Sequence, residues 1–409
     1  MLWGLIFCLL AVLSVFAGPV SADEAGLIQD ETYGMMQAGE SGNISGQNEM
    51  AVQEAEVEQI LSAMTMRDKI AQMFVVTPES LTGYEHVTAA EEATRAAVSR
   101  LPVGGLIYMG ANLESTEQIT RMLSNTMDYS MERIGLPMIL CIDEEGGSVR
   151  RISGRGIADA PDIPSMRSVG DAGDAQTAFF YGEQMGRYLS ALGFNVDLAP
   201  VADTLTEGNN QVVADRSFGW DPQMNAAMCT AVMQGLHEYG VASTFKHFPG
   251  HGSTSEDSHA GYAVSYQTME DLLSCDLIPF QAGADNGTEL IMTGHISLPN
   301  VTGDDTPATL SHMIVTGILR ERMDYEGLII TDALEMGAIT QNYSSGEAAI
   351  RSIEAGNDLI LEPADPDQAY RGVLNAVESG RISEERINES LRRIIRFKLM
   401  IRDWDAGTL

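Results

Sequence analysis

The chain has 409 residues, enough for one large domain or two ordinary ones, and its content of 44% hydrophobic and 20% charged residues is typical of a globular protein. The net charge of −34 argues against nucleic acid or an anionic membrane surface as a partner, because both bind basic patches. Acidity of this size is consistent with solubility outside the cell.

The N-terminus begins with an apolar run without charge over residues 2–20. Val20 and Ala22 suit the −3 and −1 places of a cleavage site, which predicts a secretory signal peptide over residues 1–22. The protein is then secreted, extracellular or cell-wall associated, with no stable membrane insertion after cleavage. Because no Lys or Arg precedes the run, and because about 19 apolar residues can span a bilayer, an uncleaved membrane anchor is the alternative.

A polar segment follows over residues 23–54, rich in Gly, Glu, Gln, Ser and Asn and without hydrophobic periodicity. This composition predicts a disordered spacer. Apolar residues with helical spacing begin at Val57. We therefore expect a single folded domain over residues 55–404.

Within this domain, short apolar runs alternate with longer amphipathic stretches. Eight runs predict strands: residues 72–76, 105–109, 138–142, 196–201, 241–245, 290–293, 328–331 and 358–361. Most are separated by enough chain for a helix and a return connection. Such alternation favours a parallel α/β sheet, and eight repeats favour a closed (β/α)₈ TIM-type barrel over an open doubly wound sheet. A last amphipathic helix is predicted from Ser383 to about Ile401.

Polar residues follow most of the predicted strands. In a barrel of this kind, catalytic residues lie at the C-terminal ends of strands, so these side chains are expected to gather at one rim. Buried polar groups at such a rim need a partner or a ligand. The strand-end residues are Asp143, Asp203, Lys246, His247, His295, Asp332 and Glu362.

The segment 246–259 carries a cation, three imidazoles and two carboxylates on a loop that Pro249 and the glycines keep out of regular structure. Asp257 can hydrogen-bond the ring of His259, fix its tautomer and tune its pKa, which suits a general acid/base. A solvated flexible loop is the second interpretation. A metal site built from the three histidines and Asp257 is the third, because a Pro-Gly pair breaks the helix that a His-x-x-x-His site needs.

Six segments, in chain order, resemble glycoside hydrolase family 3, and in particular its single-domain β-N-acetylhexosaminidase (β-N-acetylglucosaminidase) branch. The resemblance covers roughly residues 57–402. The segments are Ile-Asp-Glu-Glu-Gly-Gly-Ser-Val-Arg-Arg at 142–151, Phe-Asn-Val-Asp-Leu-Ala-Pro-Val at 194–201, Asp-Arg-Ser-Phe-Gly at 215–219, Lys-His-Phe-Pro-Gly-His-Gly at 246–252, Asp-Ser-His at 257–259 and Ile-Thr-Asp-Ala-Leu-Glu-Met-Gly at 330–337.

The resemblance implies a retaining exo-hydrolase that removes terminal non-reducing β-linked N-acetylglucosamine from glycans such as peptidoglycan fragments. By position, Asp332 is the expected nucleophile, His259 the general acid/base and Asp257 the residue that polarises it. No metal or other cofactor is expected, and we expect a monomer. The positions that match the sugar-holding residues of the family are Asp143, Arg151, Arg216, Lys246 and His247.

Other readings stay open. A β-glucosidase of the same family is one, although the two-domain β-glucosidases take their acid/base from a second domain, which we do not expect in this protein. Phosphorolysis is another, because a histidine donor leaves room for an anionic acceptor. A wall-glycan-binding protein without catalysis is the third, and a zinc-dependent hydrolase the fourth. Taken singly, Asp332 could be a helix-capping residue and the arginines could form surface ion pairs. Ser148 departs from the family, which more often has Arg there.

Overall fold

The computed structural model describes residues 52–208, 210, 212–254 and 263–405. The predicted signal peptide, nearly all of the predicted spacer, and both Asp257 and His259 therefore lie outside the described residues. The chain divides into a unit of residues 1–56 and a unit of residues 57–409. In the first unit, residues 52–56 are helical. None of the helices in the described ranges combines the length and the apolar character needed to cross a membrane.

Each of the eight apolar runs predicted from the sequence overlaps a strand. Two further strands, β6 and β8, were not predicted, because two residues are too few to show an alternating pattern. The strands are β1 (Phe74–Val76), β2 (Gly105–Ile107), β3 (Ile139–Ile142), β4 (Val196–Asp197), β5 (Thr244–Phe248), β6 (Ala263–Val264), β7 (Leu290–Thr293), β8 (Ile296–Ser297), β9 (Leu328–Thr331) and β10 (Ile360–Leu361).

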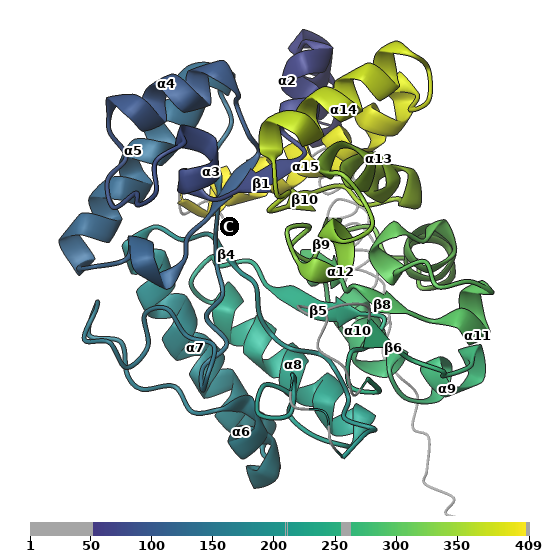
Figure 1. Cartoon of the computed structure of the whole chain (residues 1–409). Helices are drawn as coiled ribbons and strands as arrows, with labels where there is room; N and C mark the ends of the chain where they lie inside the picture. Colours follow the sequence, from purple (N-terminus) through teal and green to yellow (C-terminus); the bar gives the residue numbers. More distant parts are fainter. Residues whose placement is uncertain (1–51, 209, 211, 255–262, 406–409) are drawn as a thin grey trace, which may run out of the picture. The chain divides into compact units, whose positions relative to one another are not determined.

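Helices follow most strands and lie around the outside of them (Figure 1). A typical example is α5, where the Ser115 side chain caps the first turn and Gly135, in the left-handed conformation, ends the helix. The α-helices are α2 (Met66–Ala71), α3 (Pro78–Thr82), α4 (Glu92–Arg100), α5 (Thr116–Ile134), α6 (Met166–Ala172), α7 (Ala175–Leu192), α8 (Pro222–His237), α9 (Met269–Ser274), α10 (Leu277–Asp285), α11 (Pro299–Thr302), α12 (Gly337–Thr340), α13 (Ser345–Ala355), α14 (Pro366–Glu378) and α15 (Glu384–Asp405). Short 3₁₀ turns lie at Gly110–Asn112 and Ala308–Leu310, and a π-helix spans Met313–Arg322.

The strands form two larger parallel sheets, ordered β10-β1-β2-β3-β4 and β5-β7-β9, and a small parallel pair, β6-β8. Isolated parallel bridges lie between the larger sheets. Val196 pairs with Ala242 and Val201 with Lys246, beside β4 and β5, while Ile330 of β9 pairs with Leu359, one residue before β10. The fold is thus of the α/β class with parallel strands, as the sequence predicts.

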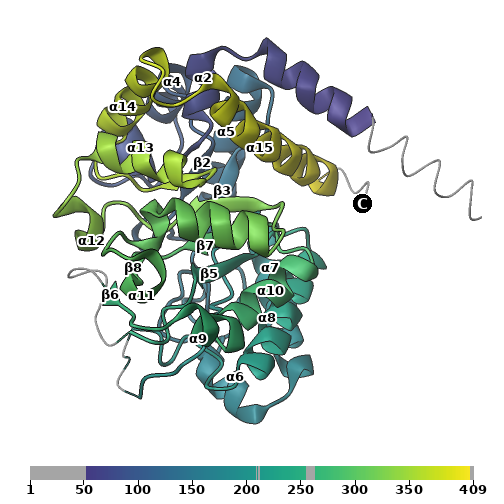
Figure 2. The ribbon, with the colours of Figure 1, turned by 90° about the vertical axis from the view of Figure 1, so that its right-hand side faces the viewer.

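Helices α7 and α8 pack closely because glycines lie where the two helices meet. Figure 2 shows α7, α8 and α10 side by side, and α7 contacts α8 over much of its length. At Gly182 of α7 an added Cβ would lie 2.3 Å from the carbonyl oxygen of Val232, and at Gly235 of α8 it would lie 2.5 Å from that of Phe179. These glycines allow two helix backbones to meet without a side chain between them.

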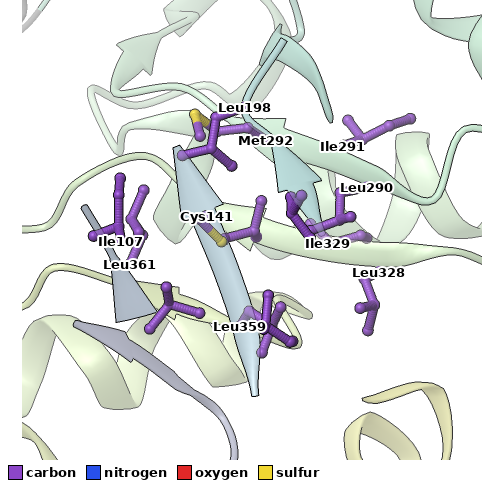
Figure 3. Packing of buried hydrophobic residues seen from close by; sticks show 14 of the residues in the cluster. Ile107, Cys141, Leu198, Leu290, Ile291, Met292, Leu328, Ile329, Leu359 and Leu361 are labelled. Carbon is purple, nitrogen blue, oxygen red and sulfur yellow. The ribbon is translucent and has the colours of Figure 1, made fainter. Parts of the chain in front are cut away.

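The apolar core fills the space between the strands. Figure 3 shows side chains of β2, β3, β7, β9 and β10 gathered there, and all of those it labels are buried. Parallel strands covered on both faces need apolar residues at successive positions, which explains why each predicted run was continuous rather than alternating. Four of the residues labelled in Figure 3 also line a cavity described below: Ile107, Leu198, Met292 and Leu361.

One local prediction was wrong. Lys246 and His247 were expected to begin a loop after the apolar run, but β5 continues through both of them to Phe248. The strand is longer because its neighbours continue to pair with it: Lys246 bridges to Val201 and Phe248 pairs with Thr293 of β7. The polar side chains of Lys246 and His247 are therefore placed by the sheet itself rather than by a loop.

A buried lysine in the last helix predicts a measurable effect on stability. Lys398 of α15 is fully buried, its Nζ lies 2.7 Å from the carbonyl oxygen of Pro137, and burial lowers its pKa to about 7. We expect Lys398→Met to raise the free energy of unfolding by roughly 1–4 kcal/mol at about pH 6, since it removes a desolvated charge.

The sign of the pH dependence follows from the pKa of Lys398, which lies below its ordinary value of 10.5. Lys398 binds its proton more tightly in the unfolded chain than in the folded protein. The destabilisation that Lys398 causes in wild type is therefore complete below about pH 7 and fades as the pH approaches 10.5. Urea denaturation at about pH 6 and pH 9 measures this gain, which should be smaller at the higher pH. Lys69→Met, which removes a partly exposed lysine, is the control. The same gain at both pH values would contradict the explanation.

Candidate active site

A cavity of about 270 Å³ lies at the C-terminal ends of the strands, and the four core residues named above form part of its apolar lining. The predicted sugar-holding residues and the predicted nucleophile all line it, whereas Asp257 and His259 lie outside the described residues. The polar side chains around the cavity are Asp143, Glu145, Arg151, Arg216, Lys246, His247, His251, Asp332, Glu335 and Glu362.

Lys246 lies at the centre of an ion-pair network. Its Nζ is 2.8 Å from Oδ1 of Asp143 and 2.6 Å from Oε1 of Glu145, and its side chain is only 2% exposed. Arg216 forms a bidentate pair with Glu145, with N–O distances of 2.7 and 2.8 Å. Burial alone would raise the pKa of Glu145, but Arg216 and Lys246 outweigh it and hold that pKa well below its usual range. Burial would lower the pKa of Lys246, but Asp143 and Glu145 outweigh it and raise that pKa, so Glu145 and Lys246 are both charged.

Arg151 is held by the loop that follows β3. The buried carboxylate of Glu144 accepts hydrogen bonds from the backbone N–H groups of residues 151–153, at 2.6, 2.9 and 2.7 Å, and from the hydroxyl of Tyr188 at 2.8 Å. The loop therefore turns around Glu144. This places Nη2 of Arg151 3.7 Å from Oδ2 of Asp143, at the cavity wall.

His247 is oriented by a fully buried carboxylate. Nδ1 of His247 lies 2.8 Å from Oδ2 of Asp203, and the backbone N–H of His247 donates to Oδ1 of the same residue at 3.1 Å. Because a carboxylate accepts, Nδ1 of His247 donates to Asp203, and this contact fixes the orientation of the ring at the cavity wall. Nε2 lies 3.4 Å from Nη2 of Arg216.

The first part of the loop after β5 lies against the loop after β4. The backbone N–H of His251 donates to Oδ1 of Asp203 at 2.7 Å, and Asn210 donates to the carbonyl oxygen of His251 at 2.8 Å. At Gly252 an added Cβ would lie 1.8 Å from the carbonyl oxygen of Thr204, so only glycine permits this approach. The start of the segment that carries the predicted acid/base is thus anchored beside the cavity.

Asp332 follows β9 and faces the cavity. Its backbone N–H donates to the carbonyl oxygen of Thr293, and its Oδ1 accepts from the N–H of Ala333 at 2.8 Å. Burial would raise the pKa of Asp332, but His295, His247 and the Ala333 N–H outweigh it and hold that pKa below its ordinary value. His295 also fixes the adjacent backbone, with Nε2 2.9 Å from the carbonyl oxygen of Ala333. The result is an ionised carboxylate that lines the cavity, the form that a nucleophile requires.

Some residues of the site were not chosen from the sequence. Glu145 pairs with two cations, yet its position inside a Glu-Glu-Gly-Gly turn suggests only a tight bend. Asp203 and Glu362 were flagged as strand-end residues, which was a usable signal, but neither was assigned a role. Glu335 lies in a quoted family segment and lines the cavity.

The metal alternative depends on Asp257 and His259, which the structure does not describe. In the described part of the chain, no group of three or more His, Cys, Asp or Glu residues is arranged to hold a metal ion. His251, the remaining member that could join His247 in such a site, has its Nδ1 2.7 Å from the hydroxyl of Thr254.

Comparison with known proteins gives consistent matches. Residues 65–397 match the family model described as glycosyl hydrolase family 3 N terminal domain. Beta-hexosaminidase A of Pseudoalteromonas piscicida is 32% identical over 336 residues, which cover 76% of this chain and 55% of that relative. Beta-hexosaminidase LpqI of Mycobacterium tuberculosis is 31% identical over 364 residues, which cover 84% of this chain and 85% of the relative.

Among solved structures, a glycoside hydrolase family 3 β-N-acetylglucosaminidase from Paenibacillus sp. str. FPU-7 has 35% sequence identity and a TM-score of 0.78, and the match covers 85% of this chain and 64% of that one. The chain thus spans just over half of the Pseudoalteromonas relative and under two thirds of the Paenibacillus protein. The family match includes every residue that lines the cavity. The chain therefore belongs to glycosyl hydrolase family 3.

Proposed function

We propose that the protein is a retaining exo-β-N-acetylhexosaminidase that hydrolyses terminal, non-reducing, β-linked N-acetylglucosamine. The observation that carries the proposal is the ionised carboxylate of Asp332 in a cavity whose other walls carry charged hydrogen-bonding groups. The relatives named above as β-hexosaminidases and as a β-N-acetylglucosaminidase support the choice of sugar.

The proposed reaction has two displacements. In the first, a carboxylate oxygen of Asp332 forms a bond to the anomeric carbon, the glycosidic C–O bond breaks, and His259 gives its proton to the leaving oxygen. In the second, water attacks the anomeric carbon, His259 takes one proton from it, and the bond to Asp332 breaks. Asp257 would hold the His259 ring and stabilise its protonated form. The support for these two residues is their position in the family resemblance.

The sugar would be held by Asp143, Arg151, Arg216, Lys246 and His247. These side chains combine ionised donors with carboxylate acceptors, which suits a ring that carries several hydroxyl groups. A cavity of about 270 Å³ is slightly smaller than the usual ligand pocket of roughly 300–1,000 Å³, which favours one sugar ring rather than an extended glycan. An enzyme that admits one terminal sugar acts from the chain end.

We also propose that the eight main strands close into a (β/α)₈ barrel with the cavity at its C-terminal mouth. The bridges Val196–Ala242 and Val201–Lys246 on one side, and Ile330–Leu359 on the other, support closure between the two larger sheets. The positions of the cavity residues, which follow successive strands, agree with this arrangement.

The natural substrates would be peptidoglycan fragments. The protein would reach them outside the cell, after export directed by the predicted signal peptide. This part rests on the sequence resemblance and on the apolar run at residues 2–20. N-terminal sequencing of the protein recovered from the culture medium and from the membrane fraction would show whether residues 1–22 are removed.

A panel of p-nitrophenyl glycosides tests the activity. The expected result is release of nitrophenol from the β-N-acetylglucosaminide, with at least tenfold lower kcat/KM on the β-glucoside and on the β-N-acetylgalactosaminide. Inorganic phosphate is then added and the products are analysed: free sugar supports hydrolysis, whereas sugar 1-phosphate would show that the enzyme is a phosphorylase. Turnover of none of the glycosides would contradict the proposal.

Replacement of the proposed acid/base is expected to show a dependence on the leaving group. His259→Ala should lower kcat/KM about a hundredfold to ten-thousandfold on an unactivated disaccharide such as chitobiose. The loss should be much smaller on a dinitrophenyl glycoside, whose leaving group departs without a proton. Asp257→Asn should show the same pattern with a smaller effect. Equal losses on both substrates would exclude proton donation as the role of His259.

A further inference from the structure

The cavity carries more carboxylates than its own cations can neutralise. The carboxylate residues lining it are Asp143, Glu145, Asp332, Glu335 and Glu362, and the lysine and arginine residues are Arg151, Arg216 and Lys246. All three cations already face Asp143 or Glu145. Asp332 is stabilised by histidines and a backbone N–H. Among the residues that line the cavity, no lysine or arginine is left to pair with the carboxylates of Glu335 and Glu362.

Glu362 is the more unusual of the two. It follows β10, is only 7% exposed and lines the cavity. No hydrogen bond or ion pair of its carboxylate is found within the described residues, although its backbone N–H donates to the carbonyl oxygen of Val75 at 2.8 Å. Its φ of +43° lies in the left-handed region, which a glutamate rarely adopts and which an ordinary strand end does not require.

The charged groups around the Glu362 carboxylate belong to several elements of the cavity wall. They are Glu335 and Asp332 after β9, Asp143 after β3, and Arg151 on the loop beyond it. Burial and the three acidic neighbours outweigh Arg151 and raise the pKa of Glu362 to about 8. A buried acid with no partner is costly and is rarely retained without a ligand to complete it.

The chemistry of the missing partner follows from this environment. The hydroxyl groups of a neutral sugar would already find acceptors in Asp143 and Glu145, so a further buried carboxylate adds little to them. A metal ion is not favoured in the described residues, where no three-residue ligand group is present. A compact cation with several N–H donors, the ammonium group of a primary amine, would pair with Glu362 and balance the negative charge of its carboxylate when it ionises.

We propose that Glu362, assisted by Glu335 at the rim, binds the protonated primary amine of an amino sugar, so that the cavity also accepts β-glycosides of hexosamines whose nitrogen is not acetylated. This inference rests on the proposed glycosidase function, because it adds a substrate class to the same site. Glu362 is then a specificity-determining residue, and the free amine of the sugar takes the place of a cation that the protein does not supply.

Kinetics with two matched substrates test the inference: the p-nitrophenyl β-glycosides of glucosamine and of N-acetylglucosamine, assayed at about pH 6, where an amine is protonated. The quantity compared is the substrate ratio, kcat/KM for the amine substrate divided by kcat/KM for the acetylated substrate. In Glu362→Gln this ratio should fall about tenfold to a hundredfold below its wild-type value, because a charge-assisted hydrogen bond to the amine is lost. Glu335→Gln should lower the ratio less, since Glu335 is exposed and screened. Glu378→Gln removes the same charge at the exposed end of α14 and should leave the ratio unchanged.

Calorimetry supplies a readout that is independent of turnover. Glucosamine should bind wild type at least tenfold more tightly than it binds Glu362→Gln, whereas the difference for N-acetylglucosamine should be smaller. Because the amine would drive Glu362 to ionise, binding of glucosamine should release a proton to the buffer in wild type and not in the variant. Titrations in two buffers with different ionisation heats measure this release, and the same titrations in EDTA test for a bound metal.

The outcomes separate the alternatives. An unchanged substrate ratio in Glu362→Gln, together with unchanged glucosamine binding, would overturn the inference. So would an equal loss on both substrates with a shifted alkaline limb of the pH profile, because that pattern identifies Glu362 as a proton donor. Selectivity that disappears in EDTA would assign the carboxylates to a metal. If wild type cleaves neither substrate, the proposed function fails, and the calorimetric difference alone decides whether the amine site exists.

Discussion

Asp332→Asn is expected to lower kcat on p-nitrophenyl N-acetyl-β-glucosaminide by about 10⁴- to 10⁶-fold, the range found when a covalent nucleophile is removed. Asn keeps the shape of the side chain but cannot form the ester bond to the anomeric carbon. The Asp332 carboxylate is ionised because His295, His247 and the Ala333 N–H outweigh its burial, so the variant loses the group that these neighbours stabilise.

Substrate binding provides the control for this prediction. In Asp332→Asn, neither KM for the p-nitrophenyl substrate nor the dissociation constant of N-acetylglucosamine should change by more than about tenfold, since the residues proposed to hold the sugar remain. Asp128→Asn, on the exposed face of α5, removes the same charge and should behave as wild type. Mass spectrometry of wild type with a slow substrate should show a sugar adduct that the Asp332→Asn protein lacks. Retention of more than about 1% of wild-type kcat would exclude Asp332 as the nucleophile.

Lys246→Met is expected to lower the free energy of unfolding by about 3–5 kcal/mol, the cost of leaving buried charges without their partner. Lys246 is 2% exposed and lies within 2.8 Å of both Asp143 and Glu145. Without it Glu145 keeps Arg216, but Asp143 keeps only the longer contact with Arg151. Activity should fall as well, because the network forms one wall of the cavity.

The pH dependence tests the cause of that loss. The pKa of Glu145 is held below its ordinary value in the folded protein. Its contribution to the free energy of unfolding is therefore present above about pH 4.5 and disappears as the pH falls through the pKa of Glu145 in the folded protein. The pKa of Lys246 is raised, so its contribution is complete below about pH 10.5 and disappears above it. Urea denaturation of wild type and variant should therefore differ most between about pH 5 and 9. Lys69→Met is the matched control, with an expected change below about 1 kcal/mol, and a loss no larger than this in Lys246→Met would refute the interpretation.

Taken together, these variants distinguish a residue that reacts from one that holds the site in place. Asp332→Asn should affect the rate and leave stability nearly intact. Lys246→Met should affect both, because a cation that pairs with two carboxylates is part of the fold as well as of the cavity. Glu362→Gln should act mainly on the ratio of kcat/KM between the amine substrate and the acetylated substrate.

The order of the elements could be predicted from the sequence because it depends on local chemistry. Each apolar run overlaps a strand, since buried parallel strands need apolar residues at successive positions. The last amphipathic helix lies within a few residues of its predicted bounds. The rule that polar residues gather at C-terminal strand ends placed Asp143, Lys246, His247 and Asp332 at one cavity. Family motifs, whose residues are read directly from the chain, supplied the membership that the comparisons confirm.

Only the tertiary structure decided which of these groups are paired and which are not. Glu145 pairs with Lys246 and Arg216, residues roughly 70 to 100 positions away, so no local pattern reveals that it is neutralised. Glu362 follows its strand in the same way as Asp332, yet one carboxylate is stabilised as an anion and the other has no described partner. The reason is that the ionisation of a buried group depends on the charges and dipoles within a few ångströms, and these come from segments that only the fold brings together.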